Sequence, residues 1–175
     1  MSSACTELMS LAPGKIFAKT GADWGLDLEA VSHGAVLADF DGDGDMDAFI
    51  PGPQGAPFFL IRNDGGKFTL VPLSNLAQIS PVNAIVVEDF DGDGKLDVVL
   101  GGNLFVSEVE TGRADAGKGL FMKGNGDGTF QPYSVYQSGL NIPGDVKDIL
   151  PITAGGKRLL LVTNNNGPLQ VFAWQ

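Results

Sequence analysis

Short apolar runs separated by tight polar turns recur along most of the chain. The clearest runs lie at 36–38, 48–50, 85–87 and 98–100, with clusters of Asp and Gly between them. Short apolar runs bounded by turn-forming residues are typical of β-strands. No segment carries the apolar spacing of a convincing amphipathic helix. The pattern therefore predicts an all-β protein.

Two acidic blocks repeat the same pattern fifty positions apart. ADFDGDGDMDAFI covers 38–50 and EDFDGDGKLDVVL covers 88–100. Apolar runs flank each block, so each is expected to form an acidic loop between two paired strands. Farther along, 58–71 and 119–133 each place an Asn/Asp/Gly turn between two apolar segments, which is typical of a β-hairpin. Each repeat is therefore expected to hold four strands.

A third and degenerate copy is expected at 145–175. Its first two strands meet at the turn 154–157, and only Asp148 stands where the other copies carry four aspartates. This copy keeps the strand pattern and loses the acidic loop, and the sequence stops after its third strand. The segment KIFAKT at 15–20, followed by Gly25-Leu26, resembles the outer strand that follows a turn such as 127–130. A missing strand at one end thus matches a spare strand at the other.

Oxygen-bearing side chains occupy alternate positions of the first acidic loop (39–47) and the second acidic loop (89–97). Calcium takes six to eight oxygens at about 2.3–2.6 Å, and such a loop offers side chains from positions 1, 3, 5 and 9 and the carbonyl of position 7. Lys95 at position 7 is then no obstacle, and glycine at position 6 permits the turn. The candidate ligands of two calcium ions per chain are Asp39, Asp41, Asp43, Asp45 and Asp47 in the first loop and Asp89, Asp91, Asp93, Lys95 and Asp97 in the second.

Other sites fit these residues less well. An EF-hand carries glutamate at position 12, where this chain has Ile50 and Leu100, and helices flank its loop. Magnesium is seldom bound by protein oxygens alone. Zinc favours His or Cys, and the only histidine, His33, has no such partner in the pattern. A solvated acidic turn is the remaining alternative, and two copies in identical register argue against it.

Composition narrows the range of partners. The chain has 175 residues, 43% of them hydrophobic, and its 25 glycines are about twice the usual share. The net charge of −10 repels phosphates and anionic lipids, so we expect no nucleic-acid partner and no membrane insertion. The opening residues lack the basic start and apolar stretch of a signal peptide, so any export signal is absent from this sequence. A single cysteine, Cys5, excludes an internal disulfide.

The acidic blocks and the turns NDGGKF and GNGDGTF resemble the FG-GAP/VCBS repeat family, over about residues 13–174. This family forms the calcium-bearing β-propeller blades also found in the integrin α-chain head. The resemblance implies that the aspartates of both loops, with Lys95, bind calcium, and that the protein works in an extracellular, periplasmic or cell-surface location. The C-terminal part also resembles large exported bacterial proteins of the ASPIC/UnbV-associated repeat type.

The resemblance implies propeller blades of four antiparallel strands, about three per chain. Propellers usually close with four to eight blades. The chain is therefore expected either to close a six-bladed ring as a homodimer or to be a fragment of a larger propeller. The expected divisions are a tail at 1–12 and propeller repeats at 13–175, with a strand at 13–30 that completes a neighbouring blade, blade 1 at 35–73, blade 2 at 84–136 with a long loop at 101–118, and a degenerate blade 3 at 145–175.

A non-catalytic calcium-binding scaffold for extracytoplasmic binding or adhesion to a protein or glycan is the expected function. One alternative is a carbohydrate-binding lectin in which Trp24 or Trp174 stacks on a sugar. Another is a polysaccharide-active enzyme module, although no Ser-His-Asp set and no phosphate-binding glycine loop occurs. The long loop 101–118 is either a solvated excursion or a ligand site, and its candidate ligand-binding residues are Glu108, Glu110, Arg113 and Asp115.

Overall fold

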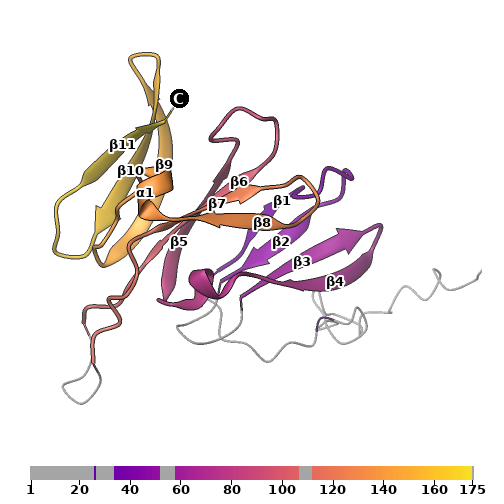
Figure 1. Cartoon of the computed structure of the whole chain (residues 1–175), viewed down its shortest axis with the longest axis horizontal. Helices are drawn as coiled ribbons and strands as arrows, with labels where there is room; N and C mark the ends of the chain where they lie inside the picture. Colours follow the sequence, from indigo (N-terminus) through magenta and orange to yellow (C-terminus); the bar gives the residue numbers. More distant parts are fainter. Residues whose placement is uncertain (1–25, 27–33, 52–57, 107–111, 175) are drawn as a thin grey trace, which may run out of the picture.

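The computed structural model describes residues 26, 34–51, 58–106 and 112–174. Within these residues the chain forms three antiparallel sheets, which follow one another in sequence and stand side by side (Figure 1). The all-β prediction is therefore confirmed. Closure of these sheets into a ring stays a prediction.

Sheet 1 and sheet 2 each contain four strands in sequential order. Glycines with positive φ form the tight turn between the last two strands of sheet 1, and the hairpins expected at 58–71 and 119–133 are both confirmed. The strands of sheet 1 are β1 (Val36–Ala38), β2 (Asp47–Ile50), β3 (Phe59–Asp64) and β4 (Lys67–Pro72), and those of sheet 2 are β5 (Val82–Glu88), β6 (Asp97–Gly102), β7 (Leu120–Gly124) and β8 (Phe130–Tyr133).

Sheet 3 contains three strands among the described residues, in the order β11-β10-β9. They are β9 (Val146–Ala154), β10 (Lys157–Asn164) and β11 (Gln170–Trp174). The turn at Gly155-Gly156 stands where the other sheets carry an acidic loop, as the degenerate third copy predicted. The segment expected to complete a neighbouring sheet, 13–30, lies outside the described residues except for Leu26.

Helical structure is confined to two single turns among the described residues. The 3-10 helix η2 (Asn75–Gln78) lies between sheets 1 and 2, and α1 (Val135–Ser138) lies between sheets 2 and 3. Neither they nor any other described segment forms a helix long and apolar enough to cross a membrane.

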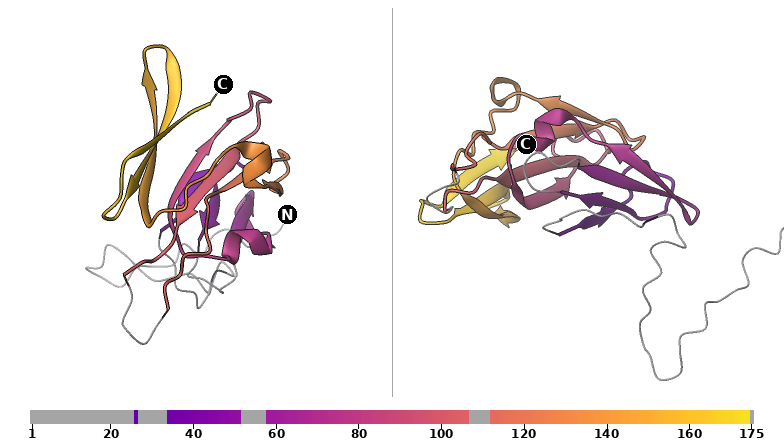
Figure 2. Two further views of the ribbon diagram at one scale, coloured as in Figure 1. Left: turned by 60° about the vertical axis from the view of Figure 1, so that its left-hand side comes forward. Right: turned by 90° about the horizontal axis from the view of Figure 1, so that it is seen from below.

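Sheet 2 is covered on both faces, and this explains why almost all of β6 is buried. Val98 and Leu100 pack with sheet 1, whereas Val99 packs with sheet 3, because successive side chains of a strand point to opposite faces. The right-hand view of Figure 2 shows sheet 2 between its two neighbours. The packing of consecutive sheets thus produces two separate apolar cores.

Three phenylalanine rings contact one another in the core between sheets 1 and 2. The ring of Phe130 in β8 meets Phe40 edge-on at 5.5 Å and Phe49 at 6.2 Å, measured between centroids. Edge-to-face pairs of this kind stabilise a core beyond the burial of their area. Phe40 belongs to the first acidic loop, so that loop is attached directly to the core.

Candidate metal centre

The two acidic loops connect the first and second strands of sheet 1 and of sheet 2. The second residue of each loop is a phenylalanine whose ring is buried, Phe40 in the first loop and Phe90 in the second. The acidic side chains around it face the solvent to different degrees. Each loop is thus anchored by apolar burial and exposes carboxylates beside the anchor.

The last aspartate of each loop is fully buried and binds two backbone N–H groups. Asp47 accepts from Phe40 N at 2.9 Å and from Asn63 N at 2.8 Å. Asp97 accepts from Phe90 N at 3.1 Å and from Gly124 N at 2.8 Å. These bonds tie the loop to the third strand of its sheet. A carboxylate in this position satisfies donors that would otherwise be buried without acceptors.

The first aspartate of each loop folds the backbone around itself. Asp39 accepts from Gly42 N at 2.7 Å and from Gly44 N at 3.1 Å. Asp89 makes the two corresponding bonds, at 2.7 and 2.9 Å, in the second loop. The glycine at position 6 has φ of +94° in the first loop and +82° in the second, a conformation that other residues rarely adopt. This confirms the turn that position 6 was expected to make.

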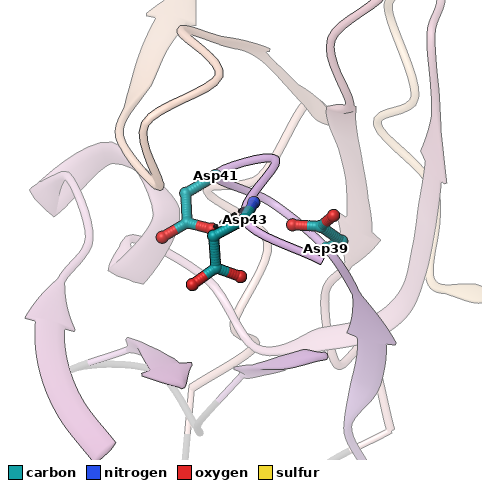
Figure 3. Close-up of side chains that lie close together, drawn as sticks. All are labelled: Asp39, Asp41 and Asp43. Atoms are coloured by element: carbon teal, nitrogen blue, oxygen red, sulfur yellow. Dashed lines mark hydrogen bonds between the residues drawn. The ribbon is translucent and has the colours of Figure 1, made fainter. Parts of the chain in front are cut away.

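The carboxylates of each loop converge. Ligand oxygens of Asp39, Asp41 and Asp43 all lie within 4.8 Å of one another in the first loop, and Figure 3 shows these three side chains. In the second loop the group is Asp89, Asp91 and Asp97, so the buried aspartate at position 9 takes part there instead of the aspartate at position 5. An all-oxygen set of this kind suits a hard divalent cation such as calcium. The residues present therefore fit the group that the sequence predicts.

The structure brings together some of the predicted ligands and separates others. Asp45 directs its carboxylate to Gly65 N in the β3–β4 turn, at 2.8 Å, and so lies outside the convergent group of its loop. The side-chain stem of Lys95 runs beside Gly126. The side chains at position 7 are thus engaged elsewhere, and the calcium prediction asks only for the backbone carbonyl there.

A basic residue faces each loop, which the sequence analysis did not predict. The ammonium of Lys123 in β7 binds Asp91 and lies 2.9 Å from Asp93. The guanidinium of Arg62 in β3 lies 3.6 Å from Asp41 and binds Asp64. Both stand at the same register of the third strand, because Ile61 pairs with Ala48 as Met122 pairs with Val98. The two residues lie 61 positions apart, so the fifty-residue repeat of the loops does not align them, and only the strand pairing shows that they correspond.

The environment shifts several carboxyl pKa values in opposite directions. Burial raises the pKa of Asp41 and also that of Asp97. The hydrogen bond from Lys123 lowers the pKa of Asp93, and the hydrogen bonds to Asp91 and then to Asp93 raise the pKa of Lys123. Burial opposes ionisation, whereas a nearby cation favours it. A cation thus stabilises ionised carboxylates at these positions.

The loop from β6 to β7 divides into a described base and a tip outside the described residues. Glu108 and Glu110 lie in that tip, so the structure does not place them. The guanidinium of Arg113 stacks 4.2 Å from the centroid of Phe105, and no ion pair joins it to Asp115 among the described residues. The four candidate ligand-binding residues therefore do not form a described cluster.

Asn103 holds the base of this loop. Its side chain is buried, accepts from Gly117 N at 2.9 Å and donates to the carbonyls of Gly117 and Gly144 at 3.0 and 2.9 Å. Its φ of 85° is uncommon for a residue other than glycine. The Asn103 side chain thus joins backbone groups of separate segments, and its role is to fix the base of the loop.

Of the aromatic and histidine candidates, only Trp174 is described. The centroid of its ring lies 5.2 Å from that of Phe90. The guanidinium of Arg158 lies over the same ring, 5.2 Å from the centroid. These contacts use Trp174 for packing. Trp24 and His33 lie outside the described residues.

Comparison with known proteins gives one match. The model of the FG-GAP-like repeat family matches residues 39–100, a segment that begins with the first acidic loop and ends after the second. A search of curated protein sequences finds no match to the chain. The family match confirms that this chain carries a repeat of the FG-GAP/VCBS family.

Proposed function

We propose that this chain is a non-catalytic, calcium-binding β-propeller scaffold that serves binding or adhesion outside the cytoplasm. The observation that carries the proposal is the convergence of three carboxylates, with their oxygens within 4.8 Å, in each of two loops of the same repeat. The family match supports a scaffold rather than an enzyme. Two calcium ions per chain, one at each loop, complete the proposal.

The hydrogen bonds of each loop support calcium over a plain acidic turn. The first and last aspartates already fold the loop around the convergent oxygens, so a cation entering it meets pre-oriented ligands. In the second loop the ammonium of Lys123 faces the same carboxylates. A bound calcium ion would bring two positive charges to these carboxylates in place of the single charge of the ammonium. We expect these sites to bind calcium weakly, with the affinity of sites that are filled at the millimolar calcium concentrations found outside cells.

Calorimetric titration of calcium into protein freed of metal by chelation tests this proposal. We expect two equivalents to bind, and the combined variant Asp41→Asn/Asp91→Asn to lose both. Magnesium in the same titration is the control cation, since it demands a smaller octahedral site and holds its waters more strongly. No calcium heat at free calcium up to about 10 mM, above the weakest extracellular class, would contradict the proposal.

The lectin and enzyme alternatives have less support. Trp174 packs against Phe90 and Arg158, which leaves it a poor platform for a sugar. Arg113 stacks on Phe105 and forms no described pair with Asp115. A glycan array probed in calcium and in chelator separates the first alternative from the scaffold, because only a lectin gives calcium-dependent spots.

A further inference from the structure

We propose that residues 14–20 of a second copy of this chain add to the free edge of β11, with Ile16 entering the cavity beside Phe90. Two copies that exchange this segment would then close a ring of six sheets. The proposal concerns the strand edge and the cavity and does not depend on calcium binding.

The edge of β11 has no strand beside it among the described residues. Sheets 1 and 2 each contain a fourth strand, whereas β11 is the last strand of sheet 3 in the part of the chain that the structure describes. An unpaired edge offers a row of backbone donors and acceptors to another strand. Nearby, the buried Nε1 of Trp174 finds no acceptor among the described residues. Buried donors are seldom left unpaired, so an acceptor from outside these residues is expected.

A cavity of about 430 Å³ lies beside this edge, between sheets 2 and 3. Its walls include Phe90, Val99 and Trp174. Phe90 and Val99 stand fifty positions after Phe40 and Phe49, the two rings that Phe130 contacts between sheets 1 and 2. The cavity thus lies where the inward side chain of a fourth strand fills the neighbouring interface.

The sequence around residues 14–20 resembles that of the fourth strand of sheet 2. Four residues around the segment have counterparts of the same or similar type 114 positions later, in β8 and the turn that follows it. These pairs are Gly14 with Gly128, Ile16 with Phe130, Gly25 with Gly139 and Leu26 with Leu140. By this register Ile16 takes the place of Phe130, and the cavity is large enough for its side chain.

The order of the sheets requires a second copy. Leu140 follows β8 and is buried in the core between the sheet of that strand and the next sheet. Leu26 is the counterpart of Leu140, and the sheet that follows it in the chain is sheet 1. By analogy, Leu26 lies between sheet 1 and the sheet that accepts 14–20, so that accepting sheet must pack on the outer face of sheet 1. In the same chain, sheet 3 packs on the far side of sheet 2 (Figure 1). The sheet 3 that accepts the segment therefore belongs to another molecule.

The two outer faces support the same arrangement. On sheet 3, Leu150, Leu161 and Val171 stand in register on the face away from sheet 2, and Val171 is 53% exposed. On sheet 1, Leu37 and Leu70 stand in register on the outer face, and Leu37 is 66% exposed. Sheet 3 of one copy against sheet 1 of the other would cover both faces, as the two internal interfaces already do.

Light scattering coupled to size exclusion tests the proposal with single variants on each side of the contact. The intact chain is expected at about twice its 18.3 kDa mass. Ile16→Asp and Val171→Asp are each expected to give monomers, and circular dichroism checks that each keeps its strands. Tyr136→Asp is the matched control, because the side chain of Tyr136 is 99% exposed and does not line the cavity, so the dimer should stay intact.

Mixing the two single variants provides the decisive arm. A mixed dimer holds one contact with both residues intact, so the mixture should recover dimers that neither variant forms alone. An intact chain that stays monomeric at every concentration would overturn the proposal. Dimers that survive both substitutions would also overturn it, because the contact would then lie elsewhere. A mixture that recovers no dimers would overturn it as well, because it would exclude exchange of the segment.

Discussion

Replacing Asp97 by asparagine separates the structural role of the second acidic loop from its metal-binding role. Asp97 is fully buried and accepts the backbone N–H groups of Phe90 and Gly124. An asparagine of the same shape can accept only one of these bonds, because its NH₂ group faces the other donor. The substitution therefore leaves one buried N–H without an acceptor.

The size of the effect follows from that donor. An unsatisfied buried N–H costs about 1–3 kcal/mol. The remaining hydrogen bond is also weaker, because its acceptor is a neutral amide oxygen instead of a charged carboxylate. Burial raises the pKa of Asp97, so the carboxylate is itself ionised at a cost that the neutral amide avoids. We therefore expect Asp97→Asn to lower the free energy of unfolding by about 2 kcal/mol in chelator, which corresponds to about 4–8 °C in melting temperature for a chain of this size.

Asp91→Asn is the matched control in the same loop. Asp91 is more exposed, and its partners are the ammonium of Lys123 and the N–H of Asp93. In chelator this substitution is expected to change stability by about 0.5 kcal/mol or less. At a hundredfold excess of calcium over its dissociation constant, an intact site adds about 2.7 kcal/mol, which both variants should lose.

Urea unfolding of the three proteins in calcium and in chelator checks this prediction. The expected pattern is a loss for Asp97→Asn in both conditions and a loss for Asp91→Asn in calcium alone. Equal stability of Asp97→Asn and the unmodified chain in chelator would refute the structural role of the buried carboxylate. A calcium increment retained by Asp91→Asn would refute its role as a ligand.

Three further predictions concern the loops and the core. Lys123→Met should strengthen calcium binding at the second loop about twofold to fivefold, since it removes a competing cation from Asp91 and Asp93, and calorimetry would contradict this if the affinity fell. Calcium binding should weaken as the pH falls from about 7 to about 4, and the weakening should begin above the ordinary aspartate range because burial raises the pKa of Asp97. In chelator, the stability that Asp97 contributes is present below its unfolded pKa and is lost as the pH rises through its raised folded pKa. A pH-independent affinity across that range would exclude Asp97 as a ligand. Phe130→Ala should cost about 3–4 kcal/mol in urea unfolding, because its ring contacts Phe40 and Phe49 between two sheets, and a cost below about 1 kcal/mol would show that sheets 1 and 2 pack without it.

The sequence by itself determined the strands and the acidic loops, because both depend on neighbours close along the chain. Asp39 bonds to N–H groups three and five residues away, so loop geometry could be predicted from spacing alone. Alternating apolar residues and Asn/Gly turns likewise predict hairpins locally. The convergence of Asp39, Asp41 and Asp43 belongs to this local level.

The tertiary structure decided which side chains complete each loop and which faces become core. Asn63 and Gly124 meet the buried aspartates from the third strand, and Lys123 reaches Asp91 across thirty-two residues of sequence. Spacing within a loop carries no information about a strand that folds back onto it. Val98 and Val99 are equally apolar in the sequence, and they enter different cores only because sheet 2 lies between two sheets. Contacts between distant segments depend on sheet order and register, and these are fixed only when the sheets pack together.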